Sequence, residues 1–161
     1  MVLLTGETEG TMRHVDTVII HCSATPANRR LEPADLTRMH RKRGFNGCGY
    51  HFYIRRTGEI CDMRPVEKVG AHCKGHNEGS IGICYEGGLD AKGNPADTRT
   101  SEQKNAMKWL LETLKREFDI KHIGGHRDFS PDLDGDGMIE PEEWVKECPC
   151  FDVKEWLENG C

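Results

Sequence analysis

The sequence lacks several features that would assign it to a broad class at once. No apolar run approaches the roughly 20 residues that a membrane-spanning helix needs, and the first residues lack the basic start and apolar middle of a signal peptide. Basic side chains are not in excess, because 22 lysines and arginines stand against 27 aspartates and glutamates. We therefore expect a protein made in the cytoplasm, with no membrane span and no nucleic acid as partner.

Local pairs of metal ligands are also missing. The chain contains no CxxC pair and no HExxH segment, so neither a zinc ribbon nor a thioredoxin-type redox site is indicated. It does contain eight cysteines in 161 residues. A chain of this length can bury a substantial core and no export signal is visible, so we expect mostly reduced thiols packed as small apolar side chains.

The apolar pattern predicts strands separated by helices. A β-rich run covers 15–23, a hairpin with a Thr-Gly turn covers 49–66, and another apolar strand covers 79–87. A polar loop, rich in glycine, is expected at 87–99.

Three segments have helical periodicity. One begins at Pro33, with Leu36, Met39 and His40 on one face. The next begins after Thr100, where Gln103 completes a capping box, and its apolar positions are Met107, Leu110, Leu111, Leu114 and Phe118. A short helix is expected at 152–159. Together these elements predict a single α/β domain over 15–161, with a mixed central β-sheet flanked by helices, after a lead-in segment at 1–14.

Acidic residues are concentrated near the C-terminus, where 132–161 contains ten acidic and two basic side chains. Residues 132–143 fit the twelve-residue calcium loop, with acids at positions 1, 3, 5, 9 and 12, glycine at 6 and a main-chain carbonyl at 7. The candidate ligands are Asp132, Asp134, Asp136, Met138, Glu140 and Glu143. Because Ser130-Pro131 breaks any preceding helix, a bound calcium would be structural. The alternative is an acidic turn held by side-chain hydrogen bonds to its own backbone.

Three candidate ligands of a softer metal lie where strands or loops end: His21, His126 and Cys148. Imidazole and thiolate are typical zinc ligands, and a catalytic zinc takes three protein ligands and keeps one position open. Taken singly, a histidine is more often a hydrogen-bonded structural residue and a cysteine is usually part of the core. On spacing alone, Cys150 reaches the same ion as readily as Cys148.

Five short segments carry more information through their order than any one carries alone. They are HCSAT at 21–25, GYHF at 49–52, GAHCKGHNEGSIGI at 70–83, GGHRD at 124–128 and KECPCFD at 146–152. Together they resemble the type-2 N-acetylmuramoyl-L-alanine amidases, in particular the zinc-dependent phage lysozymes, which are relatives of peptidoglycan recognition proteins. The resemblance covers about residues 15 to 157.

The resemblance implies an amidase or peptidoglycan-recognition fold and a zinc ion held by His21, His126 and Cys148. Cys148 is preferred to Cys150 because it fits the K-x-C-P pattern of the family, whereas Cys150 falls where that pattern tolerates serine.

The remaining site residues are also carried over from the resemblance. Tyr50 of GYHF and Lys146 match the catalytic pair of the family. His72 and Asn77 match positions near its muropeptide-binding groove.

These expectations combine into one function and several alternatives. The chain is expected to hydrolyse the amide between N-acetylmuramic acid and L-alanine in peptidoglycan, as an endolysin that acts on the cell wall once released, and to be a monomer. A recognition domain that binds peptidoglycan or muropeptides without cleaving them is one alternative. A cytoplasmic amidase of muropeptide recycling and a scaffolding protein built on the calcium loop are two others.

Overall fold

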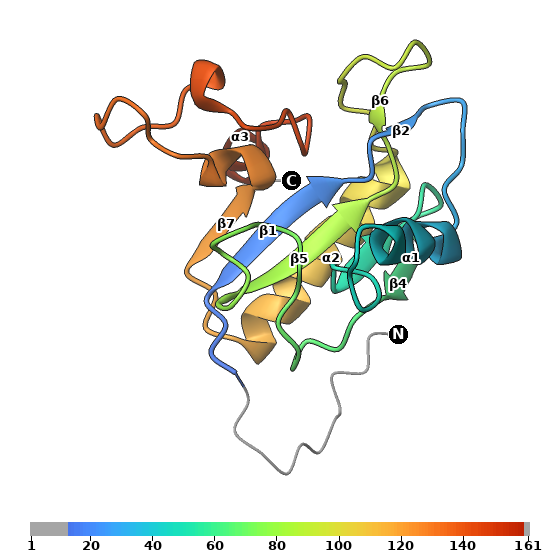
Figure 1. The fold of residues 1–161 in the computed structure, drawn as a ribbon, viewed down its shortest axis with the longest axis horizontal. Helices are drawn as coiled ribbons and strands as arrows, with labels where there is room; N and C mark the ends of the chain where they lie inside the picture. Colours follow the sequence, from blue (N-terminus) through green and yellow to red (C-terminus); the bar gives the residue numbers. More distant parts are fainter. Residues whose placement is uncertain (1–12, 160–161) are drawn as a thin grey trace.

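The fold is built on a central sheet of five strands, described here from a computed structural model that covers residues 13–159 (Figure 1). The strand order is β4-β3-β5-β1-β7. Only the β3–β4 hairpin is antiparallel, and the other neighbours pair in parallel. The predicted mixed sheet is therefore confirmed. The strands are β1 (Thr17–Cys22), β3 (Phe52–Ile54), β4 (Ile60–Asp62), β5 (Ser80–Tyr85) and β7 (His122–Gly125).

A second, two-stranded sheet continues the two central strands. β2 (Thr25–Pro26) follows β1 and pairs in parallel with β6 (Gly88–Leu89), which follows β5. This small sheet lies beyond the carboxyl ends of β1 and β5, as Figure 1 shows.

Helices cover both faces of the central sheet. They are α1 (Pro33–Lys42), α2 (Ser101–Glu117) and α3 (Val153–Glu158), with 3₁₀ turns η1 (His126–Phe129) and η2 (Pro141–Glu143) near the C-terminus. Among residues 13–159, no helix is long and apolar enough to cross a membrane.

The main hydrophobic core lies between the sheet and α2. Alternate residues of β1, namely Val18, Ile20 and Cys22, point into this core. Successive strand residues point to opposite faces, so His21 points to the other face. That face carries α1, whose Leu36 packs with Tyr53 of β3 in a smaller cluster. The alternation of β1 thus places a histidine outside the main core although it is buried, with 1% of its surface exposed.

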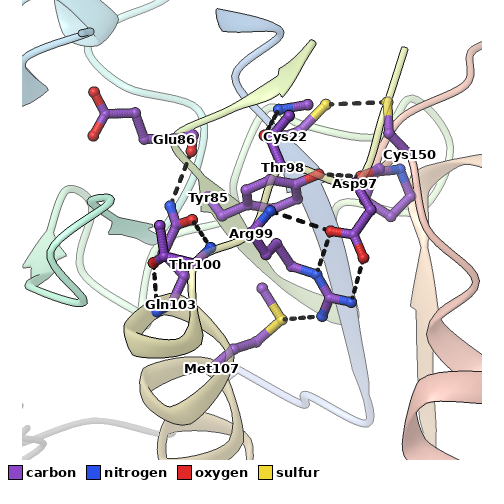
Figure 2. Close-up of polar contacts among 12 residues, drawn as sticks. Cys22, Tyr85, Glu86, Asp97, Thr98, Arg99, Thr100, Gln103, Met107 and Cys150 are labelled. Atoms are coloured by element: carbon purple, nitrogen blue, oxygen red, sulfur yellow. Dashed lines mark hydrogen bonds and ion pairs between the residues drawn. The ribbon is translucent and has the colours of Figure 1, made fainter. Parts of the chain in front are cut away.

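The start of α2 forms as the capping pattern predicts. The side chain of Thr100 accepts a hydrogen bond from the Gln103 N–H (3.1 Å), and the Gln103 side chain accepts one from the Thr100 N–H (3.0 Å). The amide of Gln103 also donates to the carbonyls of Ile54 (3.2 Å) and Glu86 (2.9 Å), so this cap ties the helix to β3 and to the end of β5 (Figure 2).

Several details differ from the sequence expectations. Phe118, expected within the second helix, is the residue that caps α2, and β6 lies in the segment expected to be a loop. Met39 was expected on the buried face of α1, but it is 47% exposed, because only the i, i+4 pair Leu36 and His40 faces the sheet. Strand β7 was not expected at all. Its sequence, HIGG, contains one apolar residue and two glycines, which weaken a strand pattern.

The first described residue is anchored to the domain. The guanidinium of Arg13 donates hydrogen bonds to the carbonyls of Val66 (2.7 Å), Glu78 (2.7 Å) and Ser80 (2.9 Å). Residues 1–12, the rest of the expected lead-in segment, lie outside the described part of the chain.

A buried arginine connects the loop before α2 with the C-terminal segment. The Arg99 side chain is 3% exposed and makes a bidentate ion pair with Asp97. Its Nε donates to Oδ1 at 2.9 Å and its Nη2 donates to Oδ2 at 3.0 Å (Figure 2). Its guanidinium lies 3.3 Å from the ring centroid of Phe151 and 4.7 Å from that of Trp156. Cation–π contacts are stronger when they are shielded from water. Arg99 thereby holds the segment that follows Cys148 against the domain.

We expect replacement of Arg99 by Met to lower the free energy of unfolding by about 2–3 kcal/mol, because the variant loses the ring contacts and leaves Asp97 without its partner. Calorimetry should find a Tm lower by roughly 5–10 °C. Arg38→Met is the control, because Arg38 forms an exposed ion pair with Asp35 (2.6 Å) and such pairs contribute about 0–1 kcal/mol. Equal Tm values for the two variants would contradict this role of Arg99.

Candidate metal centre and active site

Three ligand candidates converge at one edge of the sheet. Parallel pairing places the carboxyl ends of β1 and β7 side by side, and His21 lies near the end of β1 while His126 is the first residue after β7. Cys148 comes from the C-terminal loop. One ligand atom from each of the three residues lies within 4.8 Å of the others. The residues that were expected to share a metal are therefore close enough to do so after small side-chain movements.

A glycine allows the cysteine segment to approach. A Cβ atom on Gly125 would lie 2.5 Å from Cδ of Pro149, the residue after Cys148, so only glycine fits at this position of β7. The N–H of Arg127 donates to the Cys148 carbonyl (2.9 Å). The N–H of Cys22 lies 3.2 Å from the Cys148 sulfur and donates to it. These contacts fix the thiol beside His21.

His72 orients the buried ligand. Its Nδ1 shares a hydrogen bond with Nε2 of His21 (2.8 Å), which leaves the Nδ1 edge of His21 for an ion. The side-chain oxygen of Asn77 accepts hydrogen bonds from the backbone N–H groups of His72 and Cys73, both at 2.9 Å. His72 and Asn77 thus form a supporting layer behind His21. Residues in such a layer set the tautomer and orientation of a metal-binding histidine.

Electrostatics favour a neutral His21. Burial is the main cause that holds the pKa of His21 well below its usual range, and the neighbouring histidines and the charge of Lys146 lower it further. Burial, followed by His51, lowers the pKa of His72 to about 3. Neutral imidazole is the form that binds a metal, so this environment favours ligation. Lys146 itself is exposed.

Tyr50 lies beside the same histidine. Its ring centroid is 4.9 Å from that of His21, and burial, with a smaller effect of Cys84, raises the pKa of its hydroxyl well above the usual range. The hydroxyl therefore stays protonated near neutral pH and can donate a hydrogen bond.

The sequence did not assign a role to His40, which supports Tyr50. Nδ1 of His40 accepts a hydrogen bond from the N–H of Gly49 (2.7 Å), and the His40 and Tyr50 rings lie 5.1 Å apart. The single available signal was its position on the inward face of a helix, which is also typical of a core histidine.

The acidic loop folds around its own carboxylates. Oxygens of Asp132, Asp134 and Asp136 lie within 4.8 Å of one another, and so do those of Asp134, Glu140 and Glu143. Main-chain N–H groups also bind these oxygens. Asp132 accepts from Gly135 (2.7 Å), Asp136 accepts from Met138 (2.8 Å), and Glu143 accepts from Leu133 (2.6 Å). The geometry therefore contains features of both the calcium loop and the hydrogen-bonded turn.

This loop is attached next to the metal centre. The guanidinium of Arg127, the neighbour of His126, lies 3.9 Å from the ring centroid of Trp144. The N–H of Val145 donates to the hydroxyl of Ser130 (3.1 Å). The chain that leaves the acidic loop is thus held near η1 just before it reaches Lys146.

Comparison with known proteins identifies the family of the chain. The sequence model of the N-acetylmuramoyl-L-alanine amidase family matches residues 11–149. The endolysin of Enterobacteria phage K11 is 36% identical over 141 residues, which cover 88% of this chain and 84% of that protein.

Solved structures of the same kind are similar in fold. The N-acetylmuramoyl-L-alanine amidase LysC from Clostridium intestinale matches with a TM-score of 0.71 at 24% identity, over 91% of this chain and 85% of that one. Drosophila PGRP-LB matches with a TM-score of 0.64 at 27% identity, over 88% and 78% of the two chains. The chain therefore belongs to the type-2 N-acetylmuramoyl-L-alanine amidase family.

Proposed function

We propose that this protein is a zinc-dependent amidase that hydrolyses the bond between N-acetylmuramic acid and L-alanine in peptidoglycan. The observation that carries the proposal is the convergence of His21, His126 and Cys148 beside Tyr50. A family member that only recognised peptidoglycan would not need this set of residues.

The donor set fits zinc. Two imidazoles and one thiolate are ligands that zinc accepts, and three protein ligands leave one position for chemistry. The hydrogen bond between His21 Nε2 and His72 Nδ1, and that from the Cys22 N–H to the Cys148 sulfur, supply the orientation that such ligands need. When bound, zinc supplies Lewis-acid polarisation of a carbonyl and makes water nucleophilic near neutral pH.

The protein's own groups take the remaining roles. Tyr50, kept protonated by burial, donates a hydrogen bond that orients the scissile amide or the attacking water. The ammonium of Lys146 carries positive charge toward the oxygen on which negative charge develops. The charge of Lys146 is one of the causes that lower the pKa of His21, which supports this role.

The bond specificity can be tested by digesting purified sacculi. We expect new L-alanine amino groups without new reducing sugar ends, and we expect a zinc chelator to stop the reaction. Binding to sacculi without any release of amino groups would favour the recognition domain instead. Cleavage of soluble muropeptides with intact sacculi left untouched would favour the recycling amidase.

Replacement of Cys148 by Ser should remove zinc, because the ligand set loses its thiolate. Metal analysis should find about one zinc per chain in the parent protein and well under that in Cys148→Ser, with activity on sacculi lost in parallel. Cys61→Ser is the matched control, because Cys61 lies on β4 at the far edge of the sheet. Retention of one zinc per chain in Cys148→Ser would exclude this residue as a ligand.

Replacement of Lys146 by Ala should lower kcat by about 10²–10³-fold while zinc content stays unchanged, because a preorganised donor to an oxyanion contributes about 3–4 kcal/mol. Lys154→Ala is the control, since Lys154 is an exposed lysine on α3. Steady-state turnover of a soluble muropeptide measures both. An unchanged kcat for Lys146→Ala would show that Lys146 is a surface lysine without a catalytic role.

We also propose that the loop at 132–143 binds calcium in a structural role. The spacing of its acids is that of the calcium loop. Its attachment through Trp144 to Arg127 would let the ion brace the chain that carries Lys146.

Addition of calcium to protein treated with a calcium-selective chelator should raise Tm by roughly 5–10 °C at 100-fold excess over the dissociation constant. Glu143→Gln should abolish most of this rise, because it changes the carboxylate at position 12. Glu142→Gln, at position 11, should not. No rise in Tm for the parent protein would leave the loop as a turn held by its own hydrogen bonds.

A further inference from the structure

Two thiols outside the proposed ligand set face each other beside the metal centre. The sulfur atoms of Cys22 and Cys150 lie 3.9 Å apart, close to van der Waals contact, although 128 positions separate the residues in sequence (Figure 2). Neither belongs to the His21, His126 and Cys148 group. Both are free thiols in the structure.

The fold holds this pair in place from both sides. Cys22 points to the face of β1 opposite His21, because the two residues are consecutive in a strand. Cys150 follows a tight turn in which its N–H donates to the Glu147 carbonyl (2.8 Å) and its φ is 66°.

A glycine makes room for the pair. A Cβ atom on Gly88 would lie 2.5 Å from the Cys22 sulfur and 3.7 Å from that of Cys150. The close approach of the two thiols to β6 therefore depends on the absence of a side chain at this position.

Access to the two thiols is unequal. Cys22 is 7% exposed, whereas Cys150 is half-buried and reaches the surface. An oxidant from solvent therefore meets Cys150 first, and Cys22 is the neighbouring thiol that can complete a crosslink.

We propose that Cys22 and Cys150 are an oxidation site that forms an intramolecular disulfide when the protein meets a small disulfide oxidant. The bond would fasten the segment that carries Cys148 to the end of β1. It would form on the face of β1 that does not carry His21, so the substrate side of the metal centre would stay open.

The chemistry is two successive thiol–disulfide exchanges. The Cys150 thiolate attacks one sulfur of the oxidant, whose S–S bond breaks and releases one thiol, and a mixed disulfide remains on Cys150. The Cys22 thiolate then attacks the Cys150 sulfur and releases the second thiol. The protein loses two protons and two electrons, and the oxidant gains both as two thiols.

The inference does not rest on the proposed amidase activity. It requires the position of the Cys148–Phe151 segment, which is held by the contact of Arg99 with Phe151 and by that of Gly125 with Pro149. Its test is therefore a map of sulfur bonds rather than an assay of hydrolysis.

The full-length protein, with zinc added, should be incubated with oxidised glutathione, alkylated and digested with trypsin. We expect a crosslink between peptides 14–29 and 147–154, with Cys148 alkylated or unreacted rather than linked. Cys150→Ser and Cys22→Ser should each abolish the crosslink, and Cys61→Ser should retain it. Absence of the crosslink, a bond through Cys148, or a glutathione adduct that persists on Cys150 would each overturn the proposal.

Thermal unfolding supplies a second measurement. A crosslink that closes a loop of this length should raise the Tm of the oxidised parent protein by roughly 5–10 °C over its reduced form. Oxidised and reduced Cys150→Ser should have the same Tm. An oxidised parent protein with an unchanged or lower Tm would show that the bond does not fasten the segment.

Discussion

The site depends on the attachment of the C-terminal segment to the end of the sheet. Two of the proposed ligands, His21 and His126, lie on β1 and directly after β7, whose ends are aligned by parallel pairing. The third, Cys148, comes from a loop more than a hundred residues away from the first. Contacts along the chain hold that loop, among them Pro149 on the bare backbone of Gly125, Arg99 on the ring of Phe151, and the Cys22 N–H on the Cys148 sulfur. None of them uses a metal. The protein thus brings the three side chains together without an ion, and this preorganisation would lower the entropy cost of binding one.

Much of the fold could be predicted from local sequence. The capping pair Thr100 and Gln103 identifies the start of α2, and period-2 alternation identifies β1 and β5, because these signals come from residues that are neighbours in the chain. β7 could not be predicted in this way. Its two glycines leave room for Pro149 and Phe129 to pack against the strand, and these contacts form only when the chain has folded. Met39 was wrongly expected on the buried face of α1. Helical periodicity indicates which side of a helix is apolar, but it does not show how much of that side the sheet will bury.

The same distinction between what the sequence indicates and what only folding brings together applies to the candidate site. The order of five segments pointed to His21, His126, Cys148, Tyr50 and Lys146. The structure brings the three proposed ligands together, with Tyr50 beside His21. The place of His72 behind His21, and the use of the Asn77 side chain to hold that loop, could not be read from spacing, because both depend on the relative position of two strands and a connecting loop. Resemblance to a family identified these residues, and the folded structure shows which of them contact one another.

The alternation of side chains along β1 has one further consequence. The Cys22 sulfur points into the main core and the His21 imidazole points to the opposite face of the sheet. The register of β1 with β5 fixes this orientation. A deletion of one residue within this strand would exchange the two faces. The sulfur would then turn toward Tyr50 and His72 and the imidazole into the hydrophobic core, so the length of this strand before His21 is fixed to the residue.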